Sequence, residues 1–142
     1  MSLIIRKAAS ADVPALTGCY AAAYAPFQHL GLPPVTEGVD ADIADHNVWV
    51  AEVDGTLRGG VVLVLGKRAY IANLAVHPDA SGQGVGPQLI AQALAAAKAA
   101  GHGQVHLVTH CGMTRTQGFY RRHGWTETGR DGDKVYFATQ LN

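Results

Sequence analysis

The sequence is poor in cysteine and in charge. Cys19 and Cys111 are its only cysteines, too few for a disulfide framework, so both are expected to be reduced and buried. Charged residues make up 15% of the chain, and the 11 basic residues balance the 11 acidic ones to a net charge of zero. Nucleic-acid duplexes and anionic membrane surfaces attract proteins that carry a basic surplus. The lack of such a surplus argues against nucleic acid and membranes as partners.

Long apolar runs and low-complexity segments are also missing. No stretch approaches the roughly 18 apolar residues of a membrane-spanning helix, and the segment from Met1 to Lys7 lacks the apolar core of a signal peptide. We therefore expect a cytoplasmic protein. With 142 residues, 48% of them hydrophobic, the chain fits a single domain over residues 1–142 that buries a core without disulfide or metal staples.

Turn and cap residues divide the chain into strands and helices. Asp54-Gly55 lies between two β-rich runs and predicts a hairpin, and Pro14 suits the first turn of a helix. A strand, a helix and a strand between residues 70 and 109 predict a βαβ unit with parallel strands. The pattern predicts strands at 3–6, 48–53, 57–65, 70–76, 105–108, 125–128 and 135–139, and helices at 13–25, 82–101 and 114–123. The expected fold class is α+β, a mixed and largely antiparallel sheet with helices on both faces and a central βαβ unit.

Residues 26–46 follow no simple pattern, because Gly31, Pro33, Pro34 and Gly38 interrupt them. Only a short helix at 39–44 is expected there. An irregular stretch of roughly 20 residues in a small domain usually covers a binding site. The ring side chains near this stretch form either the wall of an acceptor pocket or ordinary core; they are Tyr20, Tyr24, Phe27 and His29, with Trp49 opposite.

A glycine-rich segment, Ser81-Gly82-Gln83-Gly84-Val85-Gly86, links a predicted strand to a predicted helix. Alternating glycines let the backbone turn sharply and approach a ligand closely. The helix start behind them offers unpaired N–H groups and the positive end of the helix dipole, which suit phosphate. The segment lacks the Gly-Lys-Ser/Thr of a P-loop, and its G-x-G-x-G spacing differs from the dinucleotide fingerprint. A tight connection without a ligand is the alternative.

Two segments resemble the GNAT superfamily of N-acetyltransferases. Residues 74–86, with Val76-His77-Pro78 ahead of the glycine-rich helix start, resemble the acetyl-CoA motif of that family. Residues 118–125, with Phe119-Tyr120 ahead of Gly124-Trp125, resemble its second signature. The order of the elements and the chain length fit as well, so the resemblance covers nearly the whole chain.

The resemblance implies acetyl-CoA as co-substrate and a primary amine of a small molecule or peptide as acceptor. Backbone groups of Leu74, Ala75 and Val76 would pair with the pantetheine arm as an added strand. Thr116 would face the CoA arm. Tyr120 would lie near the thioester sulfur, where a phenol of pKa near 10 can protonate the leaving thiolate. Amides of the loop and of the residues just beyond it would hold the pyrophosphate; these belong to Gly82, Gln83, Gly84, Val85, Gly86 and Gln88.

Three positions depart from the family pattern. Ser81 stands where the family usually has Arg or Gln, Thr116 where many members have Asn, and Ala72 where many have Glu. These departures motivate an alternative function, a catalytically weakened CoA-binding module that regulates or senses. A nucleotide-binding regulator that uses the same loop is a third reading, and a homodimer is compatible with each of them.

The general base is left open between Glu52, His77 and water, with Asn73 able only to orient a water or the substrate. His102, His106 and His110 recur every four residues, and Cys111 follows the last of them. On the strand predicted there, four-residue steps span about 13 Å, so these side chains cannot meet at one ion. No metal site is expected.

Overall fold

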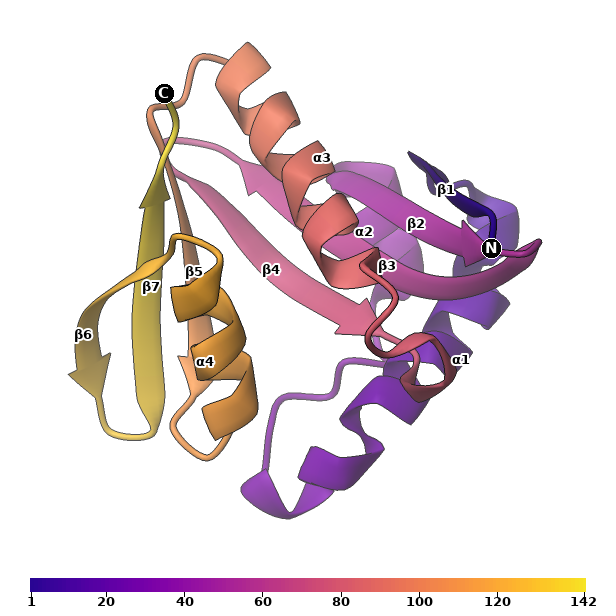
Figure 1. Cartoon of the computed structure of the whole chain (residues 1–142), viewed down its shortest axis with the longest axis horizontal. Coiled ribbons are helices and arrows are strands. Elements are labelled where there is room, and N and C mark those ends of the chain that lie inside the picture. Colours follow the sequence, from indigo (N-terminus) through magenta and orange to yellow (C-terminus); the bar gives the residue numbers. More distant parts are fainter.

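A seven-stranded sheet forms the centre of the molecule in the computed structural model, which describes residues 1–142 (Figure 1). Its strand order is β1-β2-β3-β4-β5-β7-β6. The β4–β5 pair is parallel and every other pair is antiparallel, as the sequence predicted. The strands are β1 (Leu3–Lys7), β2 (Asn47–Val53), β3 (Thr56–Leu65), β4 (Ala69–Val76), β5 (Gln104–His110), β6 (Thr126–Asp131) and β7 (Lys134–Gln140).

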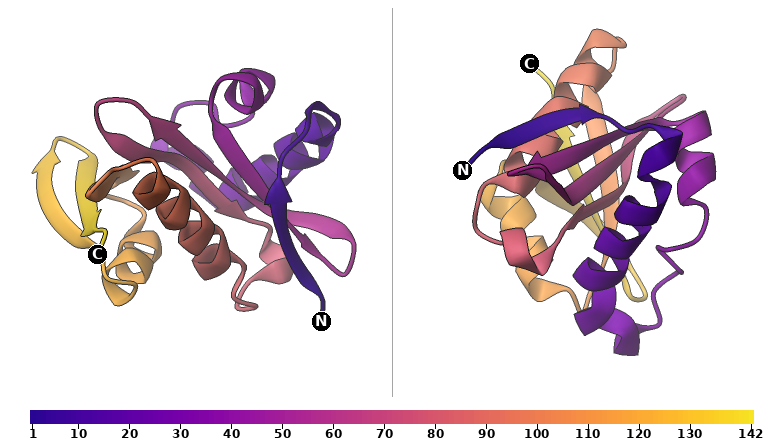
Figure 2. Two further views of the ribbon diagram at one scale, coloured as in Figure 1. Left: turned by 90° about the horizontal axis from the view of Figure 1, so that it is seen from above. Right: turned by 90° about the vertical axis from the view of Figure 1, so that its right-hand side faces the viewer.

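Helices cover both faces of the sheet (Figure 2). The helices α1 (Val13–Tyr24) and α2 (Val39–Asp45) pack on one face, while α3 (Val85–Ala99) and α4 (Thr114–Arg122) pack on the other. Short 3-10 turns occur at Ser10–Asp12, Ala25–Leu30 and Pro78–Ala80. The predicted α+β fold with a central βαβ unit is confirmed. None of these helices is both long enough and apolar enough to cross a bilayer.

The parallel pair β4–β5 is short. Its register joins only Ala69–Ile71 to Val105–Leu107. The register of β4 against β3 then shifts, because Val62 faces Asn73 while Leu63 faces Ile71, and this leaves Ala72 as an extra residue. Such a bulge bends a strand and strengthens its twist. Beyond it, β4 and β5 separate toward their C-terminal ends (Figure 1).

Two glycines in β3 allow helices to approach it from opposite faces. A Cβ on Gly59 would lie 2.9 Å from a methyl of Val85 in α3, and a Cβ on Gly60 would lie 2.6 Å from a methyl of Leu16 in α1. Successive strand residues point to opposite faces, so this adjacent pair serves both helices at once. Gly59-Gly60 therefore sets how closely α1 and α3 sit on the sheet.

The structure corrects the sequence predictions at the start of α3, at residues 25–30 and at Cys111, and it extends the last but one strand from the predicted 125–128 to Thr126–Asp131. The helix expected from residue 82 begins at Val85, because Gly82 and Gly84 adopt φ values of +76° and +80°, outside the helical region. Residues 25–30 form a 3-10 turn rather than irregular chain, since proline is well suited to the first turn of a helix. Cys19 is buried as expected, but Cys111 is exposed in the turn after β5.

Candidate active site

A cleft of about 910 Å³ lies where β4 and β5 separate. Both strands contribute to its walls, and so do the glycine-rich loop, one side of α4 and residues 24–35. The loop and α4 belong to one face of the sheet, whereas α1 and the segment after it belong to the other. The cleft therefore passes through the sheet and joins its two faces. The segment 26–46 does contribute to a concave site, as predicted from its irregularity.

The glycine-rich loop supplies free backbone donors to this cleft. None of the N–H groups from Gly82 to Gly86 donates to a carbonyl of a turn or loop, and the first N–H groups of α3 have no partner within the helix. Gly82 and Gly84 have open space where a Cβ would stand. Free donors, open space and the positive end of α3 fit a phosphate group.

The predicted loop residues fall into two groups. Gly82, Gly84, Val85 and Gly86 line the cleft, whereas Gln83 and Gln88 do not. Gly86 also lies next to α4, because a Cβ there would be 3.5 Å from the Phe119 ring. This is an ordinary van der Waals distance, so α3 and α4 meet at the edge of the cleft without an overlap that only glycine would avoid.

Tyr120 lies in α4 with its ring buried and its hydroxyl free. Only 5% of the residue is exposed, and the ring packs against Phe119, Trp125 and Phe137 with centroid separations of 5.4 to 5.9 Å. Tyr120 lines the cleft, and its hydroxyl has no hydrogen-bond partner in the protein. Burial raises the pKa of this phenol above its ordinary value, so it carries a proton at neutral pH. Thr116, one helical turn earlier, lines the same wall.

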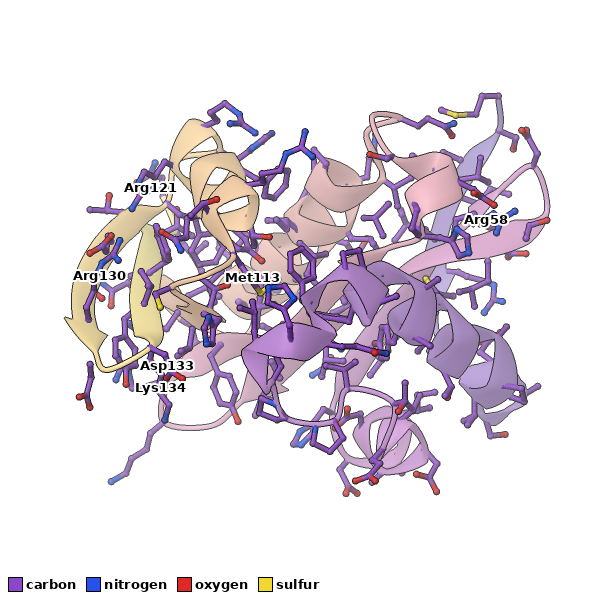
Figure 3. The ribbon with its side chains drawn as sticks, turned by 90° about the horizontal axis from the view of Figure 1, so that it is seen from below. Arg58, Met113, Arg121, Arg130, Asp133 and Lys134 are labelled. Carbon is purple, nitrogen blue, oxygen red and sulfur yellow. The ribbon has the colours of Figure 1, made fainter.

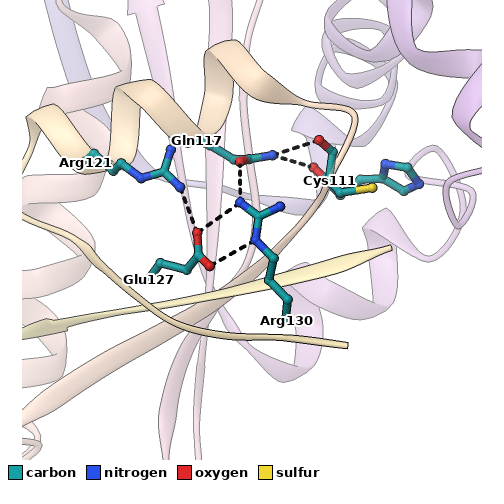
Figure 4. Close-up of polar contacts among 6 residues, drawn as sticks. Cys111, Gln117, Arg121, Glu127 and Arg130 are labelled. Carbon is teal, nitrogen blue, oxygen red and sulfur yellow. Dashed lines mark hydrogen bonds and ion pairs between the residues drawn. The ribbon is translucent and has the colours of Figure 1, made fainter. Parts of the chain in front are cut away.

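A buried amide fixes α4 to the end of β5 (Figure 4). The Gln117 side chain, 4% exposed, donates from Nε2 to the carbonyls of His110 and Cys111, both at 3.1 Å. Its Oε1 accepts from Arg130 at 3.4 Å, and Arg130 is itself paired with Glu127. This network positions the α4 wall. Sequence reasoning missed it because its partners come from two other segments, the end of β5 and β6.

The end of the cleft away from the glycine-rich loop and α4 is lined mainly by apolar side chains with a few polar groups. Tyr24 and Phe27 line it together with Asn73. The Tyr24 hydroxyl donates to Asn73 Oδ1 at 2.7 Å and lies 3.3 Å from the Leu74 carbonyl oxygen. Burial raises the pKa of Tyr24 to about 12. The structure therefore brings these three predicted acceptor-side residues together.

Three other predicted acceptor-side residues lie elsewhere. Tyr20 is 1% exposed in the core between α1 and β3, and His29 is exposed outside the cleft. Trp49 does not stand opposite the other rings, because its side chain points to the α3 face of the sheet and joins the core there. The Lys7 ammonium lies 4.5 Å from the Trp49 ring centroid. The sequence of β2 predicts that its side chains alternate between the two faces of the sheet, but it does not predict which helix covers which face.

Neither side chain proposed as a general base reaches the cleft. Glu52 pairs with Arg6 at 2.7 Å, and His77 Nδ1 accepts the Asp79 N–H at 3.1 Å. Ala72 lines the cleft at the bulge of β4, so this strand places no carboxylate there.

Sequence reasoning missed a polar cluster at the rim of the cleft. His110 ends β5. Asp133 and Lys134, both labelled in Figure 3, lie at the turn between β6 and β7. His110 Nδ1 accepts the Gly112 N–H at 2.9 Å, and Nε2 lies 3.3 Å from an Asp133 carboxylate oxygen. The ring proton therefore belongs on Nε2, facing Asp133. No three His, Cys, Asp or Glu side chains gather as metal ligands would.

Comparisons with known proteins identify the family. The family model described as an acetyltransferase (GNAT) domain matches residues 44–127, and no curated protein matches the sequence significantly. The fold is similar to that of the PaiA N-acetyltransferase of Thermoplasma acidophilum, solved with coenzyme A (TM-score 0.83, 20% identity, 99% of each chain covered). It is also similar to the ribosomal-protein-S18-alanine N-acetyltransferase of Escherichia coli (TM-score 0.81, 18% identity, covering 99% of this chain and 95% of that one).

A third similar structure is that of yncA from Salmonella typhimurium with its cofactor acetyl-CoA (TM-score 0.79, 20% identity, covering 100% of this chain and 95% of that one). At these identities the structural matches establish the fold. The family match extends over more than half of the chain and includes β4, the glycine-rich loop and the Tyr120 wall of the cleft. The chain belongs to the GNAT acetyltransferase family.

Proposed function

We propose that this protein transfers an acetyl group from acetyl-CoA to a primary amine of a small molecule or peptide, by direct attack in a ternary complex. The observation that carries the proposal is the cleft that crosses the sheet beside Tyr120. Donor and acceptor can enter such a cleft from opposite faces and meet inside it. Two cysteines without a disulfide, one of them exposed, suit a reducing cytoplasm.

On the donor side, the chain offers backbone groups rather than charged loop side chains. The unpaired edge of β4 at Leu74, Ala75 and Val76 would accept the pantetheine arm as an extra strand. The free amides of the loop and α3 would hold the pyrophosphate. Thr116 lies on the same wall as Tyr120 and would contact the arm between these two sites.

The chemistry assigns a definite task to Tyr120. The amine nitrogen forms a bond to the thioester carbon, the carbon–sulfur bond breaks, and the Tyr120 hydroxyl gives its proton to the departing sulfur. The surplus proton on the new amide nitrogen then leaves and restores the Tyr120 hydroxyl. The amine must lose a proton before it attacks. At pH 7, that loss costs a lysine-like amine about 4.6 kcal/mol, at 1.36 kcal/mol per pKa unit. Because Glu52 and His77 lie outside the cleft, we assign this proton to water.

The alanine at the bulge favours a second candidate function. Ala72 lines the cleft where many members of the family carry Glu, so a protein that binds CoA for regulation, with weakened catalysis, fits the same geometry. Binding alone does not separate the two functions. Release of free thiol does.

One sample of the protein can be tested for both functions. Calorimetry with acetyl-CoA measures binding, and a free-thiol assay with a panel of amines and amino-terminal peptides measures transfer. Binding with amine-dependent thiol release supports the enzyme. Binding without release across the panel supports the regulatory module, and no binding of acetyl-CoA contradicts both.

A further inference from the structure

On the face of the sheet that α1 and α2 occupy, β5, β6 and β7 are left uncovered. The buried cluster beneath these two helices takes its strand residues from β2, β3 and β4 only, and both helices lie away from β6 and β7 (Figure 2). Two large apolar side chains are exposed on this open area and the adjoining start of β4, Tyr70 by 43% and Val108 by 53%. Contiguous exposed apolar area is typical of a binding surface.

The open area is hollowed into a groove of about 570 Å³. In register, Tyr70 lies beside His106, and Val108 lies beside Tyr136. Leu107 points into the core beneath α3, and successive strand residues point to opposite faces, so these four side chains point away from α3. All four line the groove, whose walls are therefore mainly aromatic and apolar.

The groove opens into the cleft. Tyr24, at the acceptor end of the cleft, packs on the same face of the sheet. An acceptor whose amine lies beside Tyr120 can therefore continue from the cleft into the groove. Four residues line both hollows, namely Ile71, Ala72, Leu107 and Val108.

The far end of the groove carries a positive charge that no carboxylate neutralises. An Nη atom of Arg68 lies 2.8 Å from Nδ1 of His106. Burial and the Arg68 charge lower the pKa of His106 below its ordinary value, so the ring is neutral at pH 7. The lining of the groove contains no aspartate or glutamate. The charge of Arg68 is thus available to an acidic group of a ligand.

The length of the groove suits a short peptide. From Ala72, where the groove meets the cleft, to Arg68 at its far end there are four residue steps, about 13 Å at 3.3 Å per residue. An extended peptide advances by the same distance per residue, so about four of its residues would span the groove. A simple amine would leave the groove empty.

Resting on the proposed function, we propose that the acceptor is the amino terminus of a peptide whose second and third residues are apolar and whose fourth residue is acidic. The amine enters the cleft beside Tyr120. The apolar side chains contact Tyr70 and Val108, and the acidic side chain pairs with Arg68.

The test compares four amidated pentapeptides as acceptors, with acetyl-CoA as donor and thiol release as the readout. The reference is Ser-Phe-Leu-Glu-Ala, and the others replace Glu by Gln, Glu by Lys, or Phe-Leu by Gly-Gly. The reference should exceed the Gln peptide about fivefold in kcat/KM, the upper end for an exposed ion pair. It should exceed the Gly-Gly peptide about tenfold, because large apolar side chains leave water. Both differences should lie in KM.

Variants of Arg68 show whether this residue reads the acidic side chain. Arg68→Gln should remove the preference for Glu over Gln, and Arg68→Glu should prefer the Lys peptide. Lys67→Gln is the matched control, because Lys67 is an exposed neighbour of the same charge that does not line the groove. Its preferences should stay within twofold of wild type. Calorimetry of the peptides with CoA-saturated protein should rank them in the same order without turnover.

Three outcomes overturn the inference and leave the proposed function intact. The first is transfer to simple amines with no preference among the four peptides. The second is a preference for Glu that persists in Arg68→Gln. The third is a dimer in solution that Tyr70→Ala separates into monomers without a change in peptide kinetics, which would assign the face to a second copy of the chain. Failure to bind acetyl-CoA or to acetylate any amine overturns the proposed function as well.

Discussion

The ring and the hydroxyl of Tyr120 have different surroundings, so its packing and its capacity to donate a proton can be tested separately. Its ring is held by three aromatic neighbours, while its hydroxyl faces the cleft without a protein partner. Because burial raises its pKa, the phenol stays protonated at every pH at which the enzyme would work. A free thiolate is a weaker base than a phenolate, so the Tyr120 proton would pass to the sulfur while the carbon–sulfur bond breaks, in step with proton release from the amine nitrogen.

Tyr120→Phe should lower kcat by roughly 100-fold and by at least tenfold, because the ring packing is retained and only the donor is lost. The dissociation constant for acetyl-CoA should not change. Steady-state kinetics with an accepted amine, together with calorimetry, measure the two effects. Wild-type turnover in a variant whose chemical step is rate-limiting would show that Tyr120 only packs.

A second residue-scale feature stabilises the opposite end of the molecule. The Asp12 carboxylate accepts two hydrogen bonds from Arg6 at 2.8 Å and one from the Ala9 N–H at 2.7 Å. The hydrogen bonds from Arg6 lower the pKa of Asp12 to about 2. Since the folded state lowers this pKa, the ionised carboxylate stabilises the fold at neutral pH, and that contribution disappears as the pH falls through 4 toward 2.

Asp12→Asn should reduce the free energy of unfolding by about 1 kcal/mol at pH 7, given the partial exposure of Arg6. Asn keeps an oxygen for the Ala9 N–H, so mainly the charge is removed. Urea unfolding of both proteins at pH 7, 5, 3 and 2 should show the difference shrinking toward zero. A difference that stays constant over this range would mean that the carboxylate contributes through its shape alone.

At the scale of elements, the close packing of the helices on the sheet depends on glycines in the strands as well as on large apolar side chains. Gly60 lies in β3 directly beneath α1, and Leu16, whose methyl it faces, is fully buried. A buried leucine has little room to move aside in a close-packed interior. The helix can sit at its observed height only if residue 60 has no Cβ.

Gly60→Ala should destabilise the protein by about 2 kcal/mol, the usual cost of overpacking a core. Gly66→Ala is the matched control, because a Cβ there meets nothing within 4 Å. Thermal or urea unfolding compares the two variants. If Gly60→Ala were as stable as its control, the height of α1 above the sheet would not depend on this residue.

The order of the elements was predictable from local chemistry. Asp54-Gly55 marked the β2–β3 hairpin and the glycine-rich segment marked the start of α3. Which helices cover which face of the sheet was not predictable. Side chains of β2 alternate between the two faces in the same way whichever helix covers Trp49. Contacts between distant segments were missed for a related reason. Gln117 has the pattern of an ordinary helix residue until β5 and Arg130 are folded around it.

The same distinction between local and long-range contacts applies to the candidate site. Residues in the loop and in α4 belong to short sequence motifs, so Gly82, Gly84 and Tyr120 could be named as candidates from the sequence. The rim cluster of His110 and Asp133 joins the ends of β5 and β7, 23 positions apart. No local pattern joins such residues, because only the β5–β7 pairing brings them together.

At the scale of the whole molecule, the short β4–β5 pairing has a mechanical consequence. The sheet consists of two parts, β1 to β4 and β5 to β7, which are joined by only three residue pairs between β4 and β5. The core beneath α3 is continuous across both parts, so packing rather than strand hydrogen bonds holds them at their observed angle. A donor held by the loop beside one part and by α4 beside the other would add a second link between them, on the open side of the cleft.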